Sequence, residues 1–362
     1  MRRPLYTTAT VSVCVLVLRL GASHPQESVQ PLVRVDAIAG IVEAFKTHQL
    51  VALPDAHGNA ESHAFRLTLI ENSRFADTVD DIVIELGTAR HQDLADRYIR
   101  GEAVPPTELR KVWQDTTIPT AANNYAMAEE LLETVRAVNA SRRSGRQLRV
   151  LLGEPPIAWE HVRARADHQY YLGLRDSHPA ALAVSQVLAK RRKALLMYGA
   201  LHFQRRNIGS NYSMDAWQAQ TIVSLLEAAT STRVFVIWEA EIEQLGEAAR
   251  SWAYPSLSSV RGTSLGRKDF AIFAGPMGAR RSRIVNGKFV PVEPSEFRRI
   301  PVEEQIDAVL YLGPRTPSLP PHEVPLALCK QPGFLEEQIR RISLSAPQFE
   351  AERLQEHCAK GK

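Results

Sequence analysis

The sequence predicts an α/β fold with a mainly parallel central sheet flanked by helices. Short β-rich runs alternate with longer helical patterns along the 362 residues, which is typical of sheets built with crossover helices. The short runs are also continuously apolar instead of alternating apolar and polar residues. Continuous apolar runs indicate strands that are covered on both faces, as in parallel sheets.

The individual elements follow from these two patterns. We expect seven strands, at 50–54, 81–86, 148–152, 194–199, 233–238, 270–274 and 307–313. We expect five main helices between or before them, at 34–48, 60–75, 123–141, 177–192 and 213–230. A Pro-rich segment and a helix end the chain. The predicted organisation is therefore an α/β catalytic or binding domain over 23–320, with a Pro-rich linker and C-terminal helix over 321–362.

Composition limits the class of protein. Apolar content of 44% and charged content of 23% are ordinary for a soluble globular protein, and the net charge of +4 is mild. The basic clusters at 141–149 and 190–193 are more simply explained as solvated helix ends than as a phosphate-binding patch, so we expect no nucleic-acid partner.

The first 22 residues resemble an export signal. A basic start, "MRRP", precedes the apolar run "ATVSVCVLVL", which is too short to span a bilayer, and small residues follow near Ala22. A buried N-terminal helix or a membrane anchor are the alternatives. We expect a periplasmic or secreted protein without stable membrane insertion once the signal is removed. Cys329 and Cys358 would then be the remaining cysteines, either bridged or as two free thiols.

Ionisable residues follow several of the predicted strands. Asp55, His57 and Glu61 come after the first strand, Glu85 lies in the second, and His202 follows the fourth, with Arg205 close behind. Ligands bind beyond the carboxyl ends of parallel strands, so these groups should meet at one edge. A capping role for Asp55, a helix-start role for Glu61 and a packing role for each His are the structural alternatives. There is no P-loop pattern, GxSxG or HExxH motif.

Several motifs together resemble the erythromycin esterase-like family, within a broader GxxH α/β set that includes ChaN-like and Tiki/TraB-like proteins. "LPDAHGNAESHAFR" is similar to the family's first motif. Within it, His57, Glu61 and Arg66 match the His, the Glu and the basic residue of that motif. "DDIVIELG" supplies Glu85, "LRDSHPAALAVSQVL" supplies Arg175 and Asp176, and "ALLMYGALHFQRRN" supplies His202. Pro54-Asp55 replaces the family's Gly-Glu, and Gly199 replaces a family His.

The resemblance implies a hydrolase that activates water against an ester or lactone. The expected catalytic residues are His57 as general base, Glu85, His202, Arg66, Asp55 and Glu61. Arg175, Asp176 and Arg205 are expected to bind the substrate. No cofactor is predicted.

Two other functions remain open. In a Tiki-like metal-dependent hydrolase or protease, His57, Glu85 and His202 would bind a divalent metal. A ChaN-like haem-binding protein could use His168, Tyr170 or Tyr171 as an axial ligand. His63 is expected to have no chemical role.

Overall fold

The computed structural model describes residues 30–118, 125–142, 146–206, 220–278, 282–285, 288–291, 299–316, 324–346 and 348–360. The predicted signal segment lies outside these residues. Within them, no helix is both long enough and apolar enough to cross a membrane.

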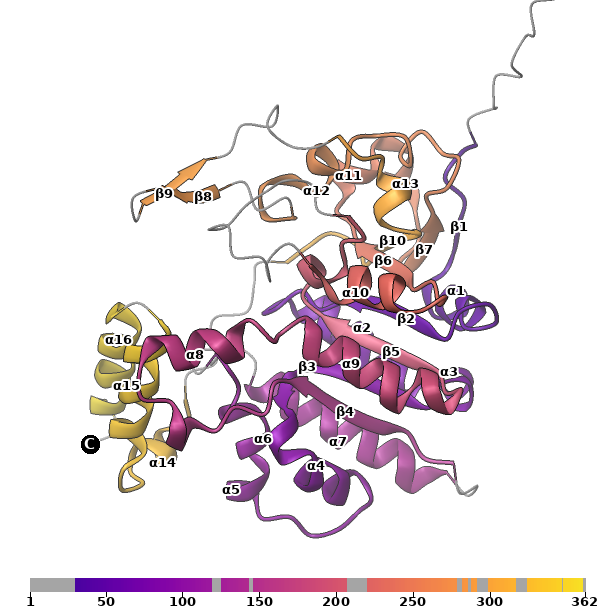
Figure 1. Cartoon of the computed structure of the whole chain (residues 1–362). Helices are drawn as coiled ribbons and strands as arrows, with labels where there is room; N and C mark the ends of the chain where they lie inside the picture. Colours follow the sequence, from indigo (N-terminus) through magenta and orange to yellow (C-terminus); the bar gives the residue numbers. More distant parts are fainter. Residues whose placement is uncertain are drawn as a thin grey trace, which may run out of the picture.

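An eight-stranded sheet forms the centre of the fold (Figure 1). Its order is β1-β7-β10-β6-β2-β5-β3-β4, and every pairing from β10 to β4 is parallel. Of the eight strands only β7 is reversed, and it pairs antiparallel with β10 on one side and with the edge strand β1 on the other. The mainly parallel sheet predicted from the sequence is confirmed. The strand bounds are β1 Arg34–Asp36, β2 Leu50–Pro54, β3 Asp81–Thr88, β4 Arg149–Glu154, β5 Ala194–Tyr198, β6 Phe235–Glu239, β7 Ser256–Ser259 and β10 Ala308–Tyr311.

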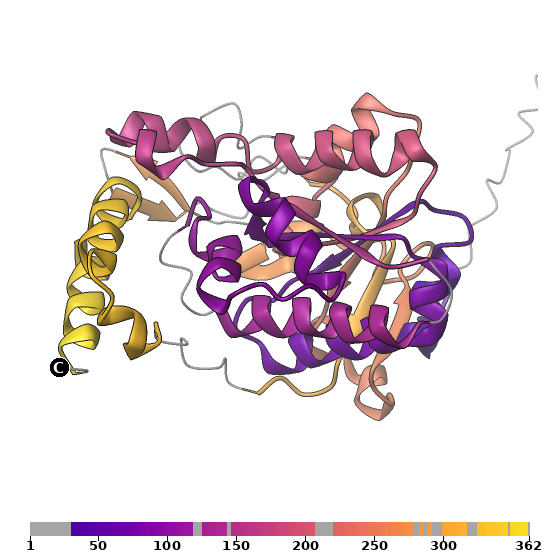
Figure 2. The same cartoon turned by 90° about the horizontal axis from the view of Figure 1, so that it is seen from below.

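Helices cover both faces of the sheet, as the continuous apolar strands require (Figure 2). One face packs against α1 (Ala37–Ala44), α2 (Ala60–Glu71), α3 (Ser73–Thr78), α4 (Gln92–Ile99) and α7 (Tyr125–Ser141). The other packs against α9 (Ser177–Gln186), α10 (Ile222–Ala229) and α12 (Phe270–Gly278). Shorter α-helices of the domain are α5 (Pro106–Leu109), α6 (Lys111–Gln114), α8 (Arg165–Leu172), α11 (Ile242–Leu245) and α13 (Val302–Gln305), and β8 (Ser282–Val285) and β9 (Lys288–Pro291) form a hairpin.

The strand predicted at 270–274 is wrong, because this segment begins helix α12. Asp269 starts the helix by accepting a hydrogen bond from the Ala271 N–H at 2.9 Å. Phe270 and Phe273 are buried while Ile272 is 68% exposed. Burial at this spacing matches a helix that packs one side on the core.

Three further predicted regions also differ from the structure. The segment predicted as one helix at 34–48 starts with strand β1 and becomes helical only after Asp36, which caps α1 through a hydrogen bond to the Ala39 N–H. β7, with the sequence SLSS, was missed because it lacks an apolar pattern. Of the helix predicted at 213–230, residues 213–219 lie outside the described part, and α10 covers Ile222–Ala229.

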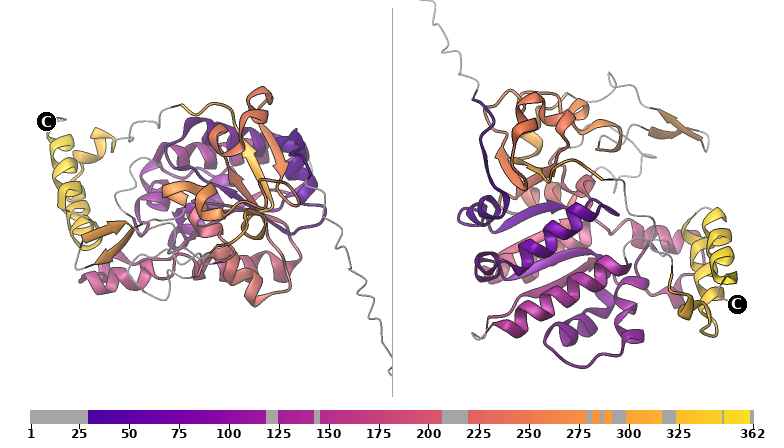
Figure 3. Two further views of the ribbon diagram at one scale, coloured as in Figure 1. Left: turned by 90° about the horizontal axis from the view of Figure 1, so that it is seen from above. Right: turned by 180° about the vertical axis from the view of Figure 1, so that it is seen from behind.

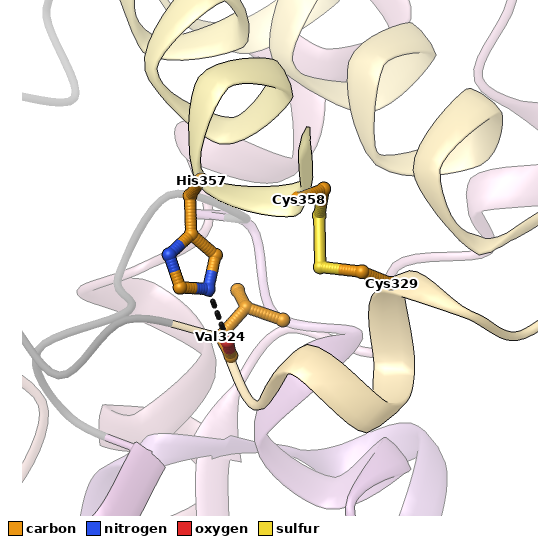
Figure 4. The surroundings of a disulfide bond; sticks show 4 residues. All are labelled: Val324, Cys329, His357 and Cys358. Carbon is orange, nitrogen blue, oxygen red and sulfur yellow. Dashed lines mark hydrogen bonds between the residues drawn. A yellow bond between two sulfur atoms is a disulfide. The ribbon is translucent and has the colours of Figure 1, made fainter. Parts of the chain in front are cut away.

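The C-terminal segment forms three helices where the sequence predicted one. α14 (Leu326–Cys329), α15 (Phe334–Ser345) and α16 (Gln348–Ala359) stand together at one side of the α/β domain, next to α8 (Figure 3). Cys329 and Cys358 form a disulfide that joins α14 to α16 (Figure 4). Beside it, the His357 ring nitrogen Nε2 lies 2.6 Å from the Val324 carbonyl oxygen and donates a hydrogen bond to it. We call residues 326–359 the C-terminal arm.

Candidate functional site

The carboxyl ends of β2, β3 and β5 bring the predicted residues together. β2 ends at Pro54 directly before Asp55 and His57, and it pairs with β5, whose last residue Tyr198 lies opposite Pro54. β3 is the neighbour of β5 on its other side and carries Glu85. The parallel pairing of β2, β5 and β3 therefore places three separate sequence motifs at one edge of the sheet.

Glu85 lies at the centre of this group and is 5% exposed. Its Oε2 accepts a hydrogen bond from the Gly199 N–H at 2.7 Å, and its Oε1 pairs with Arg175. His57 Nε2 is 3.5 Å from Oε2, and His202 Nε2 is 3.6 Å from Oε1. Burial raises the pKa of Glu85, but His57 and Arg175 outweigh it and hold that pKa well below 4.5. Glu85 is therefore an anion between two imidazoles.

His57 is the exposed member of the group, with 42% of its side chain accessible. Besides Glu85, its ring faces Asp55, with Nδ1 3.6 Å from Oδ2. Burial lowers the pKa of His57, but attraction to Glu85 and then to Asp55 raises it from 6.5 to about 10. Water screens part of this attraction because the ring is accessible. His57 carries a proton at neutral pH.

Asp55 is held from its other side by Arg66, which is buried in α2. Arg66 NH2 lies 2.8 Å from Asp55 Oδ1. Burial raises the pKa of Asp55, but Arg66 and His57 lower it below 3.8 overall. Arg66 also donates to Ser62 Oγ at 2.8 Å, and Ser62 donates to Glu239 at 2.7 Å. Burial raises the pKa of Glu239.

His202 is oriented by Asp176. The Nδ1 atom of His202 is 2.8 Å from Asp176 Oδ1, which also accepts the Ile222 N–H at 3.0 Å. The Asp176 carboxylate accepts this hydrogen bond from Nδ1, which holds the ring with Nε2 pointing away from Asp176. That Nε2 is the atom nearest Glu85, so His202 and His57 both face the same carboxylate.

Gly199 keeps the space between these side chains open. A β-carbon at this position would lie 3.6 Å from both His57 Nε2 and Glu85 Oε2, and 3.8 Å from His202 Cδ2. A larger side chain would fill the centre of the group. Gly199 therefore stands at the meeting point of the three side chains.

Two predicted residues lie elsewhere. Arg205 pairs with Glu227 and Asp307 and donates to the Val234 carbonyl, so it braces the amino ends of β6 and β10. Glu61, in the first turn of α2, accepts a hydrogen bond from the Thr316 hydroxyl. Neither makes a contact with Glu85 or with either imidazole.

The structure adds residues that sequence reasoning did not select. Glu154 ends β4 and pairs with Arg175 at 2.5 Å, and Glu239 ends β6. Each is a carboxylate at the end of an apolar strand, which is the signal that selected Glu85. His63 pairs with Glu130 across α2 and α7, with 2.7 Å between Nε2 and Oε2.

The three residues that the sequence suggested as axial haem ligands lie in other surroundings. His168 Nε2 donates to the Thr117 carbonyl at 2.8 Å, and its ring stacks on Trp159. Tyr170 is 66% exposed, whereas Tyr171 packs beside a small buried cluster. Within the described part of the chain, no three His, Cys, Asp or Glu side chains are arranged to hold a metal ion.

Comparison with known proteins gives a likeness in structure only. No family model matches the chain, and no curated protein matches it. A solved succinoglycan biosynthesis protein is 11% identical over 78% of this chain and 92% of its own, with a TM-score of 0.48. A Bacillus cereus protein has the same identity and coverages, with a TM-score of 0.42. ChaN of Campylobacter jejuni, solved with cofacial haem, is 11% identical over 56% of this chain and 87% of its own, with a TM-score of 0.33. Likenesses at this level carry no functional argument.

Proposed function

We propose that the protein is a hydrolase of the erythromycin esterase-like kind, which uses water to cleave a small-molecule carboxylic ester or lactone. The observation that carries the proposal is the pair of imidazoles facing the Glu85 carboxylate at the carboxyl edge of the sheet. One of them, His57, is accessible to solvent, and the other, His202, is oriented by Asp176.

The protonation of His57 suits it to stabilising negative charge. A pKa near 10 leaves little free base at neutral pH, so His57 is a poor acceptor for a water proton. As an imidazolium it can donate a hydrogen bond to the oxyanion of a tetrahedral intermediate. This role differs from the one expected from the sequence, in which His57 was the general base.

His202 is then the better candidate for the base. Its Nε2 takes a proton from water while the hydroxide forms a bond to the carbonyl carbon. When the intermediate collapses, the bond to the alkoxide oxygen breaks and the His202 proton passes to that oxygen. Asp176 stabilises the imidazolium that exists between these two steps. An ester or lactone is favoured over an amide because an alkoxide leaves more readily than an amine anion.

The test is a panel of p-nitrophenyl esters and small lactones with the purified full chain. His57→Gln and His202→Gln should each lower kcat by about 10²-fold or more. His63→Gln is the matched control, since His63 lies on the same segment as His57 but pairs with Glu130. Hydrolysis at wild-type rates in both site variants, or no hydrolysis of any panel member, would overturn the proposal.

The same assay distinguishes the metal-free hydrolase from the metal-dependent alternative. Activity that is lost in chelator and restored by a divalent metal would support a Tiki-like hydrolase and count against the metal-free route. A Soret band on titration with haem would support a ChaN-like binding protein.

We propose also that the protein works in the periplasm or outside the cell. The Cys329–Cys358 disulfide supports this, because such bonds persist mainly in oxidising compartments. Fractionation of cells that express the full chain tests it, and a product confined to the cytosol would contradict it.

A further inference from the structure

Glu154 is a buried carboxylate with no contact to either imidazole of the site. It is 2% exposed at the carboxyl end of β4, next to β3. Its Oε1 faces Arg175 Nε at 2.5 Å. Its Oε2 accepts hydrogen bonds from the Thr117 hydroxyl and from the Thr117 N–H, the latter at 3.1 Å. A buried carboxyl group that is held by three donors has a fixed position.

Arg175 joins Glu154 to the site. The Nε–H of its guanidinium donates to Glu154 Oε1, and its NH2 pairs with Glu85 Oε1. The carboxylates raise the pKa of Arg175 against the effect of burial, so the guanidinium stays charged. The order of charges is thus Glu154, Arg175, Glu85 and His57, with alternating signs.

In this series of charged groups, Glu154 affects how strongly Arg175 interacts with Glu85. With Glu154 charged, the Arg175 cation is shared between two carboxylates. With a glutamine at position 154, Arg175 would act on Glu85 alone and oppose the attraction of Glu85 for His57. The lost negative charge of Glu154 would act in the same direction, so both effects lower the pKa of His57.

The surroundings of Thr117 keep Glu154 in place. Trp159 Nε1 donates to the Thr116 carbonyl at 3.1 Å, and His168 Nε2 donates to the Thr117 carbonyl at 2.8 Å. Arg341 of the C-terminal arm lies over the Trp159 ring at 5.3 Å. Local packing therefore fixes the position of Thr117, whose hydroxyl and N–H hold the Glu154 carboxylate in place.

We infer that Glu154 is a positioning residue that, through Arg175, orients the Glu85 carboxylate beside His57. Its effect on catalysis rests on the proposed hydrolase function, whereas its effect on the protonation of His57 does not. Glu154 touches no substrate in this arrangement. Glu154 holds Arg175, and Arg175 in turn orients Glu85 beside His57.

The test measures the pKa of His57 by NMR titration of its imidazole C–H signal, assigned with His57→Gln. In Glu154→Gln the pKa of His57 should fall by at least about 0.5 pH unit. In Glu160→Gln it should not change, because Glu160 carries the same charge nearby but pairs with Arg90 at the surface. If panel esters are hydrolysed, Glu154→Gln should lower kcat about tenfold with little change in KM.

Glu154→Asp keeps the charge on a shorter side chain and serves if the glutamine variant does not fold. It should lower kcat less than glutamine and leave His57 protonated at neutral pH. An unchanged pKa of His57 in Glu154→Gln, or wild-type pKa and kcat in both variants, overturns the inference. A lowered pKa in a chain that hydrolyses no ester would support the inference and reject the hydrolase proposal.

Discussion

Replacing Gly199 by Ala should make the protein slightly more stable and much less active. Gly199 has φ −51° and ψ 138°, which any residue adopts. The nearest atoms to the new methyl would be at 3.6–3.8 Å, which is ordinary van der Waals contact. Gly to Ala at a compatible position adds about 0.4–1 kcal/mol by reducing the entropy of the unfolded chain. The expected rise in Tm is about 1–3 °C.

Activity should change in the opposite direction. The methyl would occupy the space beside His57 Nε2 and Glu85 Oε2, where the proposed reaction places a substrate oxygen. Displacing a reacting group by about 1 Å can cost on the order of 10²-fold in rate. We therefore expect kcat/KM for any ester turned over to fall by about 10-fold or more, measured beside the thermal unfolding of the same samples.

Gly153→Ala is the matched contrast. A β-carbon there would overlap Tyr198 Oη, which is fully buried, so this variant should lose stability by about 1–3 kcal/mol from overpacking. A Gly199→Ala protein that melts below wild type would refute the packing argument. One that melts higher but turns over esters at the wild-type rate would refute the assignment of the site.

Three other outcomes are expected. Glu85→Gln should lower the pKa of His57 toward 6.5, because Glu85 is the strongest attraction that raises it, and an NMR titration that finds no change would contradict this. Since the folded-state pKa of His57 is raised, its stabilising effect is complete below pH 6.5 and is lost as pH rises through about 10. The free energies of urea unfolding of wild type and His57→Gln should therefore converge over that window, and a widening gap would disprove the argument. Reducing the Cys329–Cys358 bond, which closes a loop of 29 residues, should destabilise the C-terminal arm by about 3.5 kcal/mol on loop entropy, seen as faster amide exchange in α16 and not in β2.

Much of the architecture could be read from local patterns. Continuous apolar runs such as 50–54 and 194–198 are buried on both faces in the sheet, and the parallel direction follows from the helices between them. Strand ends then locate Asp55, Glu85 and His202 at one edge. The same reasoning failed at 270–274, where an apolar run of similar length is helical and only the burial pattern distinguishes the two.

The sequence by itself determined which residue types stand after each strand, and hence that carboxylates and imidazoles meet at the carboxyl edge. Only the tertiary structure decided which of them pair. It set Arg175 between Glu85 and Glu154, and it placed Arg205 at the amino ends of the strands although it follows His202 by three residues. The reason is that ion pairing depends on distances of a few ångströms between distant segments. Strand order and helix packing create those distances, and neither is encoded in a local pattern.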